Sequence, residues 1–160
     1  MFLVKNIFFI RFFTACCLAL SFLFLPFLVP APANPAHKAC SAELIVVITG
    51  IETDTGTMHL AICSDERQWL NQKKPFRSAT LPIKNKKVEY VVQNVPCGTY
   101  AIKVFHDENN NGELDKNALG IPVELYGFSQ GVRPRYGSPP FETACFEITH
   151  SKKHIEIRVE

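Results

Sequence analysis

The strongest constraint in this sequence is a hydrophobic alternation with a period of two residues, which recurs in short runs between residues 44 and 159. In an extended strand, such spacing places the apolar side chains on one face and the polar ones on the other. The runs therefore predict an all-β chain, an antiparallel β-sandwich of about seven short strands. The apolar rows begin with residues 44–48 and continue as Met58/Leu60/Ile62, Val88/Tyr90/Val92, Tyr100/Ile102/Val104, Ala144/Phe146/Ile148 and Ile155/Ile157/Val159.

Local signals refine this prediction. Residues 53–56 have turn chemistry, so the runs 44–48 and 58–62 are expected to form an antiparallel hairpin. Residues 64–70 predict a short helix, in which Asp65 and Gln68 form a capping box. Pro82 lacks an amide hydrogen, which predicts an edge position for its strand.

The first 33 residues have the pattern of an export signal. Lys5 and Arg11 are their only charges, residues 12–29 are almost wholly apolar, and the small residues Ala31 and Ala33 suit signal peptidase. We expect cleavage after Ala33, with cleavage after Ala36 as the near alternative. An uncleaved anchor is the main rival, because 18 apolar residues are just long enough to span a bilayer. A lipoprotein cut before Cys16 fits less well.

Removal of residues 1–33 leaves 15 basic and 15 acidic side chains, a net charge of zero. We divide the remainder into an N-terminal linker at 34–42 and one domain at 43–160. This length excludes a multidomain enzyme, and the balanced charge argues against a nucleic-acid partner. No stable membrane insertion is expected after cleavage, and the predicted location is periplasmic or secreted.

Four cysteines remain after the signal: Cys40, Cys63, Cys97 and Cys145. An even number in a small exported domain favours two disulfides, and no Cys-x-x-Cys spacing indicates a metal site. Four cysteines allow three pairings. Because Cys40 and Cys63 would lie at one end of the predicted hairpin, we favour Cys40–Cys63 with Cys97–Cys145.

Between Asp107 and Pro140 the alternation disappears, so residues 106–141 are predicted to form a long loop. Its start resembles a calcium-binding loop. Oxygen-bearing side chains occupy positions 1, 3, 5 and 9, a glycine occupies position 6, and a carbonyl would come from position 7. The candidate Ca²⁺ ligands are Asp107, Asn109, Asn111, Glu113 (through its carbonyl) and Asp115.

The calcium pattern fails at position 12, where Ala118 replaces the usual bidentate glutamate. Glu108 or Glu124 could substitute for that ligand. The alternative interpretation is that the Asn and Asp side chains form Asx-turns that stiffen the loop without an ion. Calcium is thus the one cofactor that the sequence suggests, as a weak structural ion.

Residues 127–131 match Gly-x-Ser-x-Gly, the nucleophile pattern of α/β hydrolases. That mechanism needs a strand before Ser129 and a helix after it in a mainly parallel sheet, so we interpret the match as coincidence. The alternative function that it leaves open is a small secreted hydrolase using Ser129, with His106 as base. His106 itself is interpreted first as a loop anchor.

Aromatic residues suggest structural roles first. Tyr100 follows a tight turn, where sandwich tyrosines bond back to the main chain and close a corner. The rings in the long loop are interleaved with Arg133 and Arg135, and they either bind a sugar or peptide or pin the loop to the sandwich; we favour pinning. These rings are Tyr126, Phe128, Tyr136 and Phe141.

Three segments together resemble a known family: residues 96–115 (Pro-Cys-Gly-Thr-Tyr through Asn-Gly-Glu-Leu-Asp), 120–129 (Gly-Ile-Pro-Val-Glu, then Tyr-Gly-Phe-Ser) and 137–142. They are similar to the bacterial domain of unknown function 2141 family of exported proteins, over about residues 43–160. The resemblance implies a single exported domain of prealbumin-like or immunoglobulin-like type and no known activity. Cys97 and Gln130 depart from the family pattern.

Together these features predict an exported, non-catalytic binding or envelope-associated module. The expected working surface is the loop at 106–141, because a rigid sandwich commonly presents its binding residues on loops. The sequence offers no convincing nucleophile and base pair. The expected partner is a small ligand, a glycan or an envelope protein.

Overall fold

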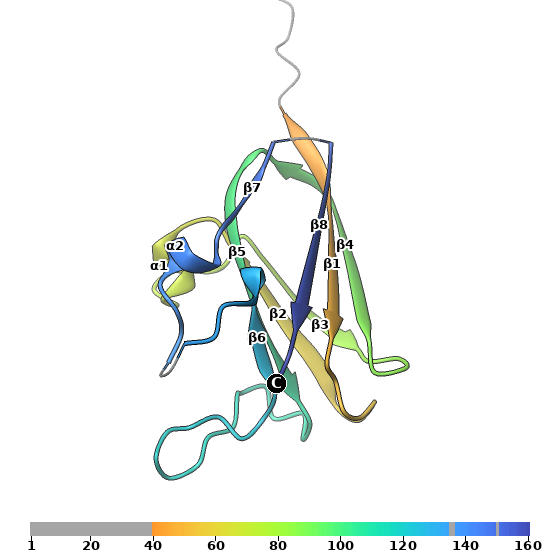
Figure 1. Ribbon diagram of the computed structural model, residues 1–160, viewed down its shortest axis with the longest axis vertical. Helices are drawn as coiled ribbons and strands as arrows, with labels where there is room; N and C mark the ends of the chain where they lie inside the picture. The colour runs from red at the N-terminus through yellow and green to blue at the C-terminus, as the bar shows by residue number, and fades with distance from the viewer. Residues whose placement is uncertain (1–39, 135–136, 150) are drawn as a thin grey trace, which may run out of the picture. The chain divides into compact units, whose positions relative to one another are not determined.

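Eight strands in the described part of the chain form two sheets (Figure 1). The computed structural model describes residues 40–134, 137–149 and 151–160, which belong to one compact unit, 37–160; the predicted signal lies outside the described residues. The strands are β1 (Ser41–Thr49), β2 (Thr57–Cys63), β3 (Arg77–Pro82), β4 (Val88–Pro96), β5 (Gly98–Asp107), β6 (Tyr126–Phe128), β7 (Phe146–Ile148) and β8 (Lys152–Arg158). The short helices are α1 (Glu66–Trp69), the 3₁₀ turn η1 (Ser129–Gly131) and α2 (Phe141–Ala144).

The predicted all-β sandwich is confirmed. One sheet has the order β4-β1-β8, the other has the order β3-β2-β5-β6, and β7 also pairs with β5. As predicted, the proline-containing β3 lies at a sheet edge. The pairing is antiparallel except between β1 and β8, which run parallel, so the expectation of a purely antiparallel sandwich was wrong at this pair.

The core lies between the two sheets and contains the predicted apolar rows. Leu44, Met58, Ile62, Ile102 and Ile157 are among its fully buried side chains. Ala144 is the exception to its predicted row. It ends α2 and packs in a second, smaller cluster with Cys63, Trp69, Ala101 and Phe128.

The predicted hairpin between β1 and β2 was wrong. β1 pairs with β4, with Val46 opposite Tyr90, whereas β2 pairs with β3 and β5 in the other sheet. β1 and β2 each have one apolar face. Because the two strands lie in opposite sheets, both apolar faces are buried in the core between the sheets. The alternation identifies the buried face of a strand but not the sheet to which the strand belongs.

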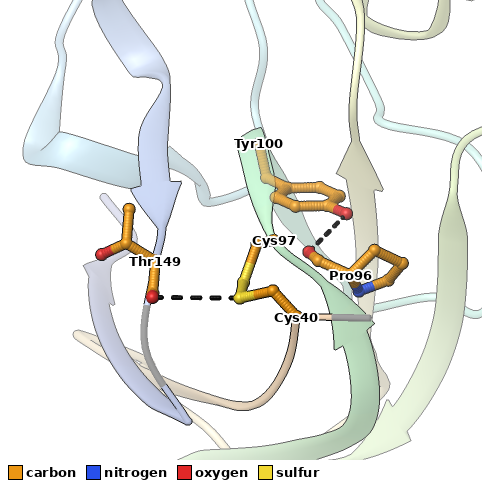
Figure 2. Close-up of a disulfide and its surroundings, with 5 residues drawn as sticks. All are labelled: Cys40, Pro96, Cys97, Tyr100 and Thr149. Atoms are coloured by element: carbon orange, nitrogen blue, oxygen red, sulfur yellow. Dashed lines mark hydrogen bonds between the residues drawn. A yellow bond between two sulfur atoms is a disulfide. The ribbon is translucent and has the colours of Figure 1, made fainter. Parts of the chain in front are cut away.

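This change of partner also corrects the disulfides. Cys40 bonds to Cys97, with the two Cα atoms 5.4 Å apart (Figure 2). Cys63 and Cys145 are free thiols. The reason is the β1–β4 register, which places Ser41 opposite Pro96 and brings the flanking cysteines together. The predicted pairs Cys40–Cys63 and Cys97–Cys145 were therefore wrong.

The predicted tyrosine corner is confirmed beside this disulfide. The Tyr100 hydroxyl donates a hydrogen bond to the Pro96 carbonyl over 3.0 Å (Figure 2). The buried ring lies 5.3 Å from the Phe76 ring, measured between centroids. The corner and the disulfide together fix the turn from β4 into β5.

Part of the loop predicted at 106–141 is ordered as β6, which the alternation is too short to reveal. β6 pairs with β5, and Tyr126 exchanges main-chain hydrogen bonds with Glu160 beyond β8. Gly127 allows this close approach, because a Cβ atom there would lie 2.9 Å from the Arg158 carbonyl oxygen. β6 therefore closes one side of the sandwich between the two sheets.

We predict that replacing both Cys40 and Cys97 with serine lowers the free energy of unfolding by about 2–4 kcal/mol. The cysteines are 57 residues apart, so the disulfide restricts a long segment of the unfolded chain. Urea unfolding of the variant measures the loss, with Cys145→Ser as the control. Non-reducing peptide mapping that recovered a Cys40–Cys63 peptide would contradict the assignment.

Candidate functional site

The outer face of the five-stranded sheet carries an ordered grid of side chains. Strand register aligns two rows across β3, β2, β5 and β6. Because the alternate residues Leu60, Ile62 and Val104 are buried in the core, these rows face the other way. The first row is Thr80, His59, Phe105 and Tyr126, and the second is Ser78, Ala61, Lys103 and Phe128.

The two rows form the floor of a groove with a volume of about 580 Å³. Asn71, which follows α1, also lines it, as do Leu114, Lys116 and Ser138 of the long loop. This volume lies within the range of small-molecule sites. The floor of the groove is a rigid sheet, and its other lining residues come from the segment after α1 and from the long loop.

An aromatic stack lies on the groove floor. The His59 and Phe105 rings are 4.7 Å apart between centroids and inclined by only 15°. Their partly exposed side chains come from neighbouring strands, so cross-strand pairing sets their alignment. Tyr126 continues this row and packs edge-on against Phe128 at 5.8 Å. These rings give the groove floor an aromatic, partly apolar surface, which suits a ring-shaped ligand.

Lys103 adds a half-buried ammonium group to the second row. Its Nζ donates to the Trp69 carbonyl and to Asn71 Oδ1, each over 2.7 Å. The same nitrogen lies 5.5 Å from the centroid of the Trp69 ring, within cation–π range. Burial lowers the pKa of Lys103, although the nearby Cys63 partly offsets this effect.

α1 positions this end of the groove. Asp65 accepts the predicted cap bond from the Gln68 amide over 2.9 Å. The Gln68 side chain accepts from the Ser64 amide rather than from Asp65, which shifts the other half of the predicted capping box by one residue. Trp69 follows, fully enclosed, and its indole nitrogen donates to the Pro139 carbonyl over 2.7 Å.

The aromatic residues of the long loop divide between two roles. Phe128 and Phe141 pack against Trp69 at 5.6 and 6.2 Å between centroids, which confirms that these rings pin the loop to the sandwich. Tyr126 and Phe128 also line the groove. Arg133 pairs with Glu160. Tyr136 and Arg135 lie outside the described residues.

The predicted calcium ligands lie in one tight loop after β5. Asp107 accepts hydrogen bonds from the amides of Asn111 and Gly112, over 3.0 and 2.8 Å. The side-chain amides of Asn109 and Asn111 donate to the Asp115 carboxylate, over 2.7 and 2.9 Å. The structure thus brings these four side chains together through Asx-turns and side-chain hydrogen bonds.

The other predicted contributors take different positions. The Glu113 amide donates to Asn111 Oδ1, over 2.8 Å. Glu124, the suggested substitute ligand, is buried and accepts from the amides of Glu108 and Asp115, each over 2.9 Å, so it ties the two ends of the loop together. No group of three or more His, Cys, Asp or Glu side chains that could hold a metal ion occurs among the described residues.

Asp107 links the loop to the groove, because its Oδ2 lies 3.2 Å from His59 Nε2. Burial raises the pKa of Asp107, but the amides of Gly112 and Asn111 and the nearby His59 outweigh burial and hold the pKa below its ordinary 3.8. The ionised carboxylate therefore stabilises the fold above about pH 3.8, and this contribution is lost as the pH falls further.

Ser129 and His106 are both buried and both bonded to the main chain. The Ser129 hydroxyl donates to the Ala144 carbonyl over 2.5 Å and accepts from the Ile102 amide over 2.9 Å. His106 Nε2 lies 2.6 Å from the Thr55 carbonyl, which supports the predicted anchoring role. Its Nδ1 lies 3.6 Å from a Glu108 carboxylate oxygen. These contacts support structural roles for both side chains.

The sequence analysis placed the working surface on the long loop, which includes Tyr126 and Phe128, and missed the groove residues on β2, β3 and β5. His59, Thr80, Lys103 and Phe105 all lie on regular strands. A signal was available in Phe105, a large aromatic residue on the polar side of the row Tyr100/Ile102/Val104. Large apolar side chains that gather on the outer face of a sheet mark an interaction surface.

The fold and the groove define a small all-β domain with a candidate ligand site on one sheet. The chain belongs to the bacterial family domain of unknown function 2141, described as an uncharacterized protein conserved in bacteria, whose model matches residues 46–156. No curated protein and no solved structure matches the chain. Among the described residues, no helix is long and apolar enough to cross a membrane.

We predict that Ser129→Ala lowers the free energy of unfolding by about 1–3 kcal/mol, because it leaves the Ile102 amide and the Ala144 carbonyl without this buried partner. Urea unfolding measures the change. The control is Ser78→Ala on the exposed face of β3, with an expected change within about 0.5 kcal/mol. Unaltered stability of Ser129→Ala would contradict the structural role.

Proposed function

We propose that this protein is an exported, non-catalytic binding domain that holds a small ring-containing ligand, such as a glycan, in the groove on the five-stranded sheet. The observation that carries the proposal is the row Thr80, His59, Phe105 and Tyr126 on the outer face of the sheet. Ring faces on the floor can stack on the ligand, while nearby hydroxyl and amide groups supply hydrogen bonds.

Export is supported by the predicted signal and by the Cys40–Cys97 disulfide, which is compatible with an extracytoplasmic location. A non-catalytic role is supported by the enclosed Ser129 hydroxyl, which is bonded to the main chain. An envelope-associated role remains part of the same proposal, because the ligand could be a glycan of the cell envelope.

We predict that Phe105→Ala and Tyr126→Ala each weaken glycan binding about tenfold. Loss of one stacked ring removes on the order of 1 kcal/mol beyond the buried area. Glycan-array screening of the purified protein identifies a ligand, and calorimetry compares the variants. Val91→Ala, on the exposed face of β4 in the other sheet, is the control and keeps full affinity. Equal affinity in all three variants would place binding elsewhere.

A weak calcium site in the loop after β5 is a second candidate. It is supported by the hydrogen bonds that hold these residues in one loop: Asp107 and Asn109 both accept from the Asn111 amide, and the side chains of Asn109 and Asn111 donate to Asp115. Calcium would draw the oxygen atoms of these side chains inward in place of the present hydrogen bonds. Because Asp107 also contacts His59, an ion there would stabilise the end of the groove.

We predict that the melting temperature is higher in 10 mM Ca²⁺ than in chelator. For a site with a dissociation constant near 1 mM, this calcium concentration raises the free energy of unfolding by about 1.4 kcal/mol. Asp107→Ala should abolish this rise. Asp54→Ala is the matched control, because Asp54 also accepts two main-chain amide bonds, from Asn85 and Lys86, in a different turn. Identical melting of the wild-type protein in calcium and chelator would exclude the ion.

A further inference from the structure

The charged side chains that line the groove indicate the charge of its ligand. This inference rests on the proposed binding function and concerns the same site. The lining residues include two lysines and one histidine but no aspartate or glutamate. Residues 34–160 have equal numbers of acidic and basic side chains, so a groove that is lined by lysines and by no carboxylate is a local feature. Charge complementarity favours an anionic ligand.

Lys103 is the more informative of the two lysines. An ammonium group has three donors, and the Trp69 carbonyl and Asn71 Oδ1 take two of them. Both acceptors are neutral, and across the described chain no carboxylate lies within 4.0 Å of Lys103 Nζ. Withdrawing a cation from water without an anion is unfavourable, and a bound anion would offset that cost.

Lys116 adds a second positive charge from the long loop. Its backbone is held by a bridge to Pro122, and its ammonium group likewise forms no ion pair with any described residue. The Asp107 carboxylate contacts His59 and accepts hydrogen bonds from the amides of Asn111 and Gly112. The Asp115 carboxylate accepts hydrogen bonds from the side chains of Asn109 and Asn111.

The remaining lining groups suit a saccharide. Phe105 and Tyr126 are cross-strand neighbours whose aromatic rings line the groove, and the apolar face of a sugar ring can pack against such rings. Hydroxyl groups of Thr80, Ser78 and Ser138 line the same groove and can bond to sugar hydroxyls. We propose that the groove binds a saccharide that carries a carboxylate, with the sugar ring against Phe105 and Tyr126 and the carboxylate on Lys103, assisted by Lys116.

The test compares trigalacturonate with its fully methyl-esterified form, which keeps the sugar rings and removes the charge. Calorimetry on the purified protein should give at least tenfold tighter binding of the acid. Lys103→Met keeps the aliphatic stem and should weaken binding of the acid about tenfold while leaving binding of the ester unchanged. Lys74→Met, an exposed lysine outside the groove, is the control and should change neither affinity.

Lys116→Met gives an independent check, because Lys116 is exposed and its loss should not disturb folding. Lys116→Met should weaken the binding of trigalacturonate about threefold. Equal affinities for acid and ester, or no effect of either groove lysine, would overturn the carboxylate assignment and leave the binding function intact. If no saccharide, charged or neutral, binds in a way that Phe105→Ala weakens, the proposed glycan-binding function fails as well.

Discussion

The pairing of β5 with β2 is the interaction on which the rest of the structure depends. β5 has ten residues, and its two faces lie in different environments. Tyr100, Ile102 and Val104 face the core, whereas Lys103 and Phe105 face the groove. A register slip of one residue would exchange the faces and place an ammonium group in the core. The same hydrogen-bond ladder therefore determines both the burial of the core and the composition of the site.

Both ends of β5 are fixed. At its start, the Cys40–Cys97 disulfide and the Tyr100 hydroxyl hold the corner to β4 (Figure 2). At its end, the Asp107 carboxylate accepts hydrogen bonds from the amides of Asn111 and Gly112 in the long loop and contacts His59 on β2. Lys103 and Phe105 thus project into the groove from a strand that is constrained at both ends, and such rigidity reduces the entropic cost of ordering a site around a ligand.

Local sequence patterns predicted much of the fold. The apolar rows, the edge position of β3, the helix at α1 and the tyrosine corner each depend on residues that are close together in the chain. The pairing of strands depends instead on residues that are far apart in the chain. Residues 44–48 could satisfy their alternation against β2 as well as against β4, and the predicted disulfides inherited that wrong choice.

The candidate site was predictable only in part, for the same reason. Its loop residues Tyr126 and Phe128 stood out as aromatic residues in a segment without alternation. His59, Thr80 and Lys103 lie on three different strands and become neighbours only through the register of the five-stranded sheet. The predicted calcium ligands, in contrast, are close together in sequence, and hydrogen bonds hold Asp107, Asn109, Asn111 and Asp115 in one loop.

The central claim is that the outer face of the five-stranded sheet is the binding surface. Chemical-shift mapping of the backbone amides during titration with a bound saccharide tests it most directly. We expect the largest shifts at Thr80, His59, Phe105 and Tyr126, which form one continuous row across four strands. Shifts confined to the sheet β4-β1-β8, with this row unaffected, would contradict the account.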